Sequence, residues 1–312
     1  MPVWFGYHIP TFTFPGVPPE GLFDQVATLA KAAEDAGFAQ VTVMDHLYQI
    51  RGIGPETEPM LEAYLALAAL SQRTDRVRLG AQVTGVTYRN PALLAKEVTT
   101  LDTLSKGRAM LGIGAAWNED EHRGYGYEFP RVGERMDRLD EALAIIRAMF
   151  REQRPSFDGR HYRIERALNV PRPLQPNGPR IMVGGGGEQR TLRIAAKHAD
   201  ITHWFGSLGL EALNHKTGLL TRYCEEIGRD PGEIERALNA PVMVARDEAA
   251  ADRMLARIPP ERRGSRPVPI DQAAEQLRPF IDAGFTGFTF NNTYLATPEE
   301  IGVAGELLRA VS

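Results

Sequence analysis

Short runs of β-branched and aromatic residues alternate with longer segments of helical hydrophobic period along the whole chain. Each run is short enough for one strand, and each following segment spaces its apolar residues three and four positions apart. The pattern predicts eight strand–helix pairs. They are Val3–Ile9 with Leu22–Ala36, Gln40–Met44 with Met60–Gln72, Val77–Val86 with a helix that begins at Pro91, Ala109–Gly114 with Arg131–Arg151, Arg180–Gly184 with Glu188–Ala196, Asp200–Trp204 with Leu208–Ile227, Ala240–Ala245 with Asp247–Arg257, and Gly287–Asn291 with Pro298–Val311.

Strands that alternate with helices pair in parallel through right-handed crossovers, which predicts an α/β fold. Eight pairs in 312 residues favour a (β/α)8 TIM barrel, a single domain over residues 1–312, over an open doubly wound sheet. The first strand–helix turn also lacks the Gly-x-Gly-x-x-Gly of open dinucleotide-binding sheets. Two insertions are predicted: a small hairpin at Phe157–Tyr162 after the fourth helix, and an extra helix, Asp271–Ala283, that follows the connector Ile258–Pro269 and precedes the last strand.

The composition limits which binding partners and which cellular compartment we expect. A formal net charge of −4 gives no electrostatic reason to expect nucleic acid or an anionic membrane surface as a partner. No stretch approaches the ~18 apolar residues of a membrane span, and the first residues lack the pattern of a secretion signal, so we expect a cytoplasmic protein. The single cysteine, Cys224, argues against a disulfide framework and a cysteine-rich metal site, and we expect no metal.

Four consecutive glycines, Gly184–Gly187, follow the fifth predicted strand and open a predicted helix. Glycine loses more backbone freedom on folding than other residues, so four in a row indicate that something approaches the backbone closely. In a barrel this turn lies at the carboxyl ends of the strands, where ligands collect. Free N–H groups and the helix dipole suit a phosphate there, with Gln189, Arg190 and Thr191 as further donors. A tight turn without a ligand is the alternative interpretation.

Asp45 and His46 end the second predicted strand and therefore belong to the same rim. A carboxylate next to an imidazole can set its tautomer and tune its pKa near neutrality, which suits a general acid or base. The alternative is a loop pair that makes only caps and turns. From the residues alone both interpretations stay open.

Other candidates follow the remaining strands. Small residues at Gly114 and Ala115 leave room for a flat ligand, and Trp117 either walls that ligand or packs beneath the loop. Phe12 either lines an apolar pocket or packs its own loop, and residues at the end of the sixth strand either contact substrate or belong to the core. The candidate substrate-binding residues are Phe12, Trp117, Asn118, His203 and Trp204.

Several long motifs, in this order and spacing, resemble the luciferase-like flavin and deazaflavin oxidoreductases, and in particular the branch that uses coenzyme F420. The resemblance covers nearly the whole chain. The motifs are "MDHL", "VTGVTYRNPALLAKEVTTLDTLSKGR", "LGIGAAWNEDEHRGYGYEFP" and "PRIMVGGGGEQRTLRIAAKHAD".

The resemblance implies a TIM barrel with a tricyclic ring across the strand mouths. It implies a non-proline cis peptide at Gln82–Val83 behind the ring, with Thr84 beside it, and a cofactor phosphate held by Gly184–Gly187. Asp45 and His46 match the pair that flanks the reactive edge of the deazaflavin, so we expect His46 to be the acid–base group and Asp45 to fix its orientation. Family members that oxidise sugar phosphates carry a Glu after the fourth strand, where this chain has Ala115-Ala116-Trp117.

We therefore expect an F420-dependent oxidoreductase that transfers a hydride between the deazaflavin C5 and a small organic substrate. An FMN-dependent luciferase-like monooxygenase is the alternative enzyme, and a barrel that binds without catalysis is the alternative outside enzymes. Met60–Leu70 is apolar almost all round, which indicates a helix that is deeply covered or lies in an interface, and the resemblance favours a homodimer.

Overall fold

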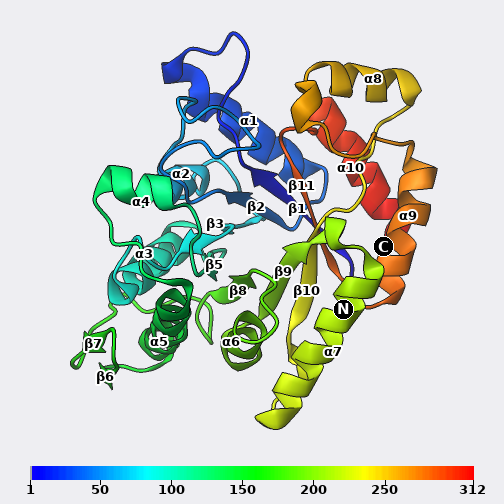
Figure 1. Cartoon of the computed structure of the whole chain (residues 1–312). Coiled ribbons are helices and arrows are strands. Elements are labelled where there is room, and N and C mark those ends of the chain that lie inside the picture. The colour runs from blue at the N-terminus through cyan, green and yellow to red at the C-terminus, as the bar shows by residue number, and fades with distance from the viewer. Residues whose placement is uncertain (1) are drawn as a thin grey trace.

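The computed structural model describes residues 2–312, which form strands at the centre and helices around them (Figure 1). Within these residues all nine strands of the main sheet pair in parallel, in the order β3-β2-β1-β11-β10-β9-β8-β5-β4. β3 and β4 are two parts of one extended segment, and a bridge between Leu79 and Ala109 brings β3 beside β5. The sheet is thus nearly closed into the predicted barrel.

The strands are β1 (Trp4–Ile9), β2 (Gln40–Val43), β3 (Arg78–Ala81), β4 (Thr84–Gly85), β5 (Met110–Gly114), β6 (Phe157–Asp158), β7 (Arg163–Ile164), β8 (Arg180–Gly184), β9 (Ile201–Phe205), β10 (Glu235–Asn239) and β11 (Gly287–Asn291). The α-helices are α1 (Leu22–Asp35), α2 (Ala63–Leu70), α3 (Pro91–Leu104), α4 (Glu119–Tyr125), α5 (Val132–Arg151), α6 (Thr191–His198), α7 (Leu210–Glu226), α8 (Glu248–Ala256), α9 (Ile270–Asp282) and α10 (Pro298–Val311).

The predicted seventh strand is wrong. Residues Ala240–Ala245 form bends and one isolated bridge, whereas the strand that completes the barrel is β10, immediately before them. The apolar run "APVMVA" is largely buried, and burial of a loop gives the same apolar pattern that a buried strand would give. By contrast, "ERALN" alternates only weakly and has little strand propensity, so its pairing between β9 and β11 decides its conformation.

Other boundaries shift without changing the architecture. The hairpin after the fourth barrel helix is present as β6 and β7. The extra helix, α9, lies beside α10 in the outer ring, while α8 lies apart from the ring in the upper part of Figure 1. The sequence analysis did not predict α4, a short helix in the loop after β5.

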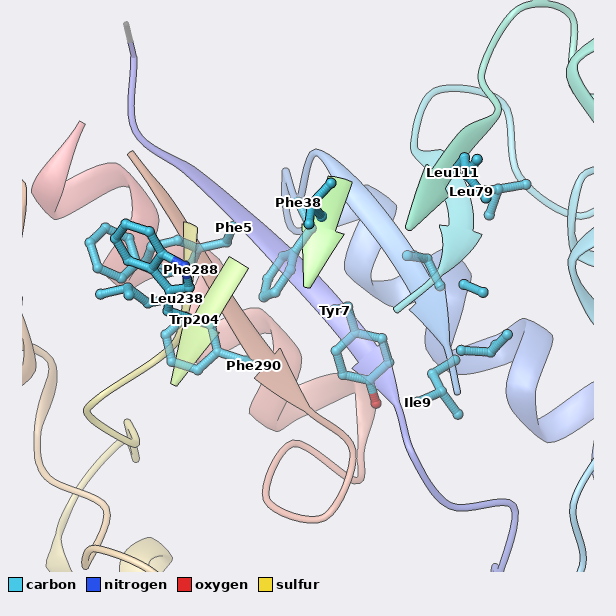
Figure 2. Close-up of a cluster of buried hydrophobic side chains, with 14 of the residues drawn as sticks. Phe5, Tyr7, Ile9, Phe38, Leu79, Leu111, Trp204, Leu238, Phe288 and Phe290 are labelled. Carbon is cyan, nitrogen blue, oxygen red and sulfur yellow. The ribbon is translucent and has the colours of Figure 1, made fainter. Parts of the chain in front are cut away.

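The main core lies between the barrel strands and the surrounding helices. Outward-facing residues of β1 and β11 supply an aromatic cluster in which Phe5 packs at 4.8 Å from Phe290 and edge-on at 6.3 Å from Phe288, between ring centroids (Figure 2). Tyr7 adds to this cluster and donates its hydroxyl to the Leu295 carbonyl at 2.6 Å. Alternate residues of each strand point into the barrel, where Met110, Met182, Ile201 and Ala237 form a smaller core below the strand mouths.

Within residues 2–312, no helix is long and apolar enough to cross a membrane.

Candidate active site

A cavity of about 510 Å³ opens at the carboxyl ends of the barrel strands. This is the end of a parallel barrel where loops from every strand converge, so side chains distant in sequence meet there. Most of the residues predicted for the site border it. The cavity is lined by His8, Pro10, Met44, Asp45, His46, Ile50, Ile53, Gln82–Gly85, Tyr88, Gly114–Trp117, Val132, Met136, Leu139, Gly184–Gly187, Thr191, His203–Phe205, Asn239 and Asn291.

The glycine loop, Gly184–Gly187, forms one side of this cavity. A Cβ on Gly184 would lie 2.9 Å from Val83 Cγ1, and Gly185 has φ of +109°, a conformation that strains any other residue. Within the described chain, the amides of Gly186 and Gly187 have no protein acceptor. The loop therefore places free donors beside the cavity, next to two positions, Gly184 and Gly185, that do not accommodate a side chain without strain.

The helix after the glycine loop begins later than predicted. α6 starts at Thr191, and a turn at residues 188–190 separates it from the glycines, so the free amides belong to the loop rather than to the first turn of the helix. Gln189 and Arg190 are exposed and do not border the cavity. Arg190 instead donates to the Gly133 carbonyl at 2.7 Å and pairs with Asp137. Their contact with a ligand stays a prediction.

Lys216 of α7 is a cation beside the glycine loop that the sequence analysis missed. Its Nζ donates to the Gly186 carbonyl at 2.7 Å and lies 3.3 Å from a carboxylate oxygen of Glu188. It stands in the middle of an ordinary amphipathic helix, and only the fold brings it to this loop.

His46 is oriented by Glu121, not by Asp45. The His46 Nδ1 lies 2.5 Å from Glu121 Oε1, while Glu121 Oε2 accepts from the Leu47 amide at 2.7 Å. Burial tends to raise the pKa of Glu121, but hydrogen bonds from His46, Tyr88 and Leu47 lower it overall, so this fully buried carboxylate is ionised. An ionised acceptor at Nδ1 holds the proton on that nitrogen and leaves Nε2 for the cavity.

Asp45 is bound instead to Arg89, which follows β4. The guanidinium donates to both Asp45 oxygens, at 2.7 and 3.1 Å, and also contacts Glu62 at 2.5 Å and Glu97 at 3.2 Å. Burial raises the pKa of the Asp45 carboxyl, and Arg89 opposes that shift. The prediction that Asp45 sets the orientation of His46 is therefore wrong, because His46 Nδ1 bonds to Glu121 while Asp45 bonds to Arg89.

Comparison with known proteins identifies the family. The sequence model described as luciferase-like monooxygenase matches residues 3–309. The chain belongs to this family. An F420-dependent glucose-6-phosphate dehydrogenase of Nocardia farcinica is 30% identical over 308 residues, covering 86% of this chain and 87% of the relative. Another of that name, from Kineococcus radiotolerans, is 32% identical over 232 residues, covering 73% of this chain and 66% of the relative.

Solved structures give the same fold for this luciferase-like protein. An F420-dependent secondary alcohol dehydrogenase in complex with an F420–acetone adduct superposes with a TM-score of 0.79 at 19% identity, over 100% of both chains. The monooxygenase RslO1 of Streptomyces bottropensis superposes with a TM-score of 0.77 at 21% identity, over 98% of this chain and 99% of the other. At these identities the likeness shows the fold alone.

The luciferase-like chain has the cis peptide that the resemblance implied, at Gln82–Val83. It lies between β3 and β4, and Gln82, Val83 and Thr84 all border the cavity. Small residues face this segment from β5, where a Cβ on Gly114 would approach Val83 Cγ2 to 3.1 Å.

Three of the five candidate substrate residues of the luciferase-like chain border the cavity, and two do not. Trp117 borders the cavity with its ring 5.6 Å from that of His46, and His203 borders it from β9. Phe12 is fully buried in the main core, and Asn118 caps α4 through the Asp120 amide; neither borders the cavity. Trp204 touches the cavity edge, but its side chain is only 2% exposed and packs edge-on against Phe285.

A row of polar side chains crosses the barrel mouth of this luciferase-like fold. His8 Nδ1 lies 3.0 Å from the Thr42 hydroxyl, which donates to Gln82 Oε1 at 3.4 Å; Gln82 Nε2 lies 3.3 Å from His203 Nε2. Burial lowers the pKa of His8 to about 3 and that of His203 to about 4, so both imidazoles are neutral near pH 7. Within residues 2–312, no cluster of three or more His, Cys, Asp and Glu side chains is arranged to hold a metal ion.

Proposed function

We propose that the protein is an F420-dependent oxidoreductase that transfers a hydride between C5 of the deazaflavin and a carbon of a small organic substrate. The observation that carries the proposal is one cavity bordered by the glycine loop on one side and by His46 on another, with the Gln82–Val83 segment among its walls. The F420-dependent enzymes among the relatives support the choice of cofactor.

The residues present fit such a cofactor. Free amides at Gly186 and Gly187 suit its phosphate, and Lys216 lies close enough to add a positive charge. Gly114 and Ala115 give the cavity wall little side-chain bulk, which suits a flat ring. When bound, the deazaflavin supplies a carbon that accepts or gives a hydride. The remaining work of the chain is to bind, to orient, to exclude water and to handle one proton.

His46 is the proposed acid–base residue. Its Nε2 is free because Glu121 occupies Nδ1, and the edge-on contact with Trp117 limits rotation of the imidazole. Glu121 is a positioning residue: it fixes the tautomer in which Nε2 takes the proton from a substrate hydroxyl or, once His46 is protonated, returns it.

A titration tests the proposed cofactor. We expect the fluorescence of F420 to be quenched or shifted in wavelength when F420 binds the purified protein. The dissociation constant should lie in the micromolar range or below. The alternative function, an FMN-dependent monooxygenase, is favoured by the description of the family model. Tight binding of FMN without binding of F420, together with O₂ uptake in the presence of reduced FMN, would replace our proposal with that alternative.

We further propose a homodimer that functions in the cytoplasm. Leu65 of α2 is 74% exposed and Leu93 of the neighbouring α3 is 53% exposed, so an apolar face remains on the two helices. Light scattering of the purified protein, with Leu65→Glu as the interface variant, tests the dimer: a wild-type monomer refutes it.

A further inference from the structure

Part of the cavity is not assigned to the cofactor. The polar side chains that line this part can form hydrogen bonds but carry no charge. Four neighbouring strands, β1, β11, β10 and β9, each contribute polar residues at their carboxyl ends. They are His8, Asn291, Asn239 and His203. We call these four residues the neutral quadrant. Its two imidazoles are neutral near pH 7, as described above, and its other two side chains are amides.

The neutral quadrant adjoins the acid–base residue. His8 lies close enough to His46 for a positive charge on His46 to lower the pKa of His8 further. When the reacting carbon of the substrate lies beside His46, the rest of the substrate therefore contacts either the neutral quadrant or the apolar loops of the cavity. Those loops contribute Pro10, Ile50 and Ile53.

The hydrogen-bond directions make His8 an acceptor toward the cavity. The Thr42 hydroxyl has one hydrogen, which it donates to Gln82 Oε1, so it accepts from His8 Nδ1. His8 Nε2 is then unprotonated, and within residues 2–312 it has no protein partner. At Asn291, the side-chain oxygen already accepts from the Thr293 amide at 3.1 Å, which leaves its NH₂ group as a donor. The Asn291 NH₂ group suits a hydroxyl or carbonyl oxygen, while the lone pair of His8 Nε2 disfavours an anionic oxygen beside it.

Three arginines near the cavity are already bound to the protein. Within residues 2–312 no Lys or Arg side chain borders the cavity. Arg89 is held by three carboxylates, and Arg135 donates to the carbonyls of Ala115 and Pro130. Arg262 donates to the Ile53 carbonyl at 2.6 Å, beside Glu58. A phosphate or carboxylate on the substrate would therefore be taken out of water without a counterion, opposite the lone pair of His8.

We infer that the substrate is an uncharged alcohol, or the corresponding ketone or aldehyde, with an apolar body, and not a sugar phosphate or a carboxylic acid. This inference rests on the proposed function. In the oxidising direction the carbinol C–H bond breaks and its electron pair leaves as hydride to C5 of F420. The hydroxyl proton passes to Nε2 of His46, and the C=O bond of the product forms. Turnover in reverse uses reduced F420 as the two-electron donor and the protonated His46 as the acid.

A matched pair of substrates tests the inference. With F420 bound, 2-propanol and lactate offer the same secondary carbinol, and lactate replaces one methyl group by a carboxylate. We expect 2-propanol, and larger neutral alcohols such as cyclohexanol, to reduce F420 with kcat/KM about 100-fold or more above lactate and glucose 6-phosphate. Asn291→Leu removes the neutral donor to the substrate oxygen, so we expect KM for the alcohol to rise about 10-fold with no change in the F420 dissociation constant. His161→Leu, which lies outside the cavity, is the control that leaves both constants unchanged.

The outcomes separate this inference from the proposed function. Turnover of lactate or glucose 6-phosphate as efficient as that of the neutral alcohols overturns the inference. F420 binding without turnover of any neutral alcohol or ketone also overturns it and leaves the proposed cofactor intact. Failure to bind F420 overturns the proposed function itself, and the inference with it.

Discussion

Replacement of Glu121 by Gln tests how His46 is controlled. The carbonyl oxygen of the introduced amide can still accept from the Leu47 amide, as the carboxylate does at 2.7 Å, but its NH₂ group then faces His46 Nδ1 at the 2.5 Å contact. Two donors cannot share that contact, so His46 moves its proton to Nε2 and offers Nδ1 as the acceptor. The base that faces the cavity is thereby lost.

The magnitude follows from the geometry. An imidazole in the wrong tautomer costs about 10⁴ in turnover in serine-protease triads. Loss of general base catalysis alone costs roughly 10²–10⁴. We expect E121Q to lower kcat by about 10²–10⁴, which corresponds to about 2.7–5.5 kcal/mol of transition-state stabilisation. The F420 dissociation constant should stay unchanged, because Glu121 does not border the cavity.

The assay is single-turnover reduction of bound F420, which separates the chemical step from binding. Glu119→Gln is the matched control: it removes a carboxylate from the same helix, α4, but one that is exposed and pairs with Arg123 on the surface. A melting curve reports the loss of the charge-assisted hydrogen bond, about 1.5–3 kcal/mol. If E121Q turns over within about threefold of the wild type while His46→Ala is strongly impaired, Glu121 does not position the base.

Further predictions concern the site and its stability. His46→Ala should lower kcat by about 10²–10⁴ with F420 binding intact; normal turnover would remove His46 from the mechanism. Gly185→Ala forces a Cβ onto a φ of +109° and should weaken F420 binding about tenfold or more, whereas Gly218→Ala, with open space around its Cβ in α7, should not; equal F420 titrations would contradict this. The folded-state pKa values of His8 and His203, about 3 and 4, lie below the unfolded value near 6.5, so the unfolded chain binds more protons and stability falls as pH drops below about 6.5, by up to ~1.4 kcal/mol per pH unit for each imidazole. Denaturant unfolding at pH 7 and pH 5 measures this slope, and His203→Gln should reduce it; an unchanged slope would refute the assignment.

The sequence predicts the barrel because its signals are repeated along the chain. The alternation of strands and helices predicts the fold even where one element is misplaced. The seventh strand, for example, is predicted at "APVMVA" but is β10, which directly precedes it. That error has a local cause: the true strand "ERALN" has weak propensity and is specified by its neighbours in the sheet. Secondary-structure propensity and hydrophobic period therefore predict the number and order of the strand–helix units better than they predict the boundaries of each unit.

The site was predictable only where a residue type carries its own signal. Glycines and a His after a strand can be found from the chain alone, because a parallel barrel gathers the carboxyl ends of its strands. The pairing of His46 with Glu121 joins two loops that are 75 residues apart, and the pairing of Asp45 with Arg89 joins two that are 44 apart. Proximity in sequence favoured Asp45 as the partner of His46, and only the packed structure distinguishes the two carboxylates.

The position of β11 has a consequence for biosynthesis. β11 pairs with both β1 and β10, yet it is made from residues 287–291, long after β1 at residues 4–9. A nascent chain that has not reached residue 287 exposes one edge of β1 together with the aromatic rings of Phe5 and Tyr7, a template to which other chains add. Fragments that end earlier should therefore aggregate rather than persist as partial barrels, because β1 gains its second neighbouring strand only when residues 287–291 have left the ribosome.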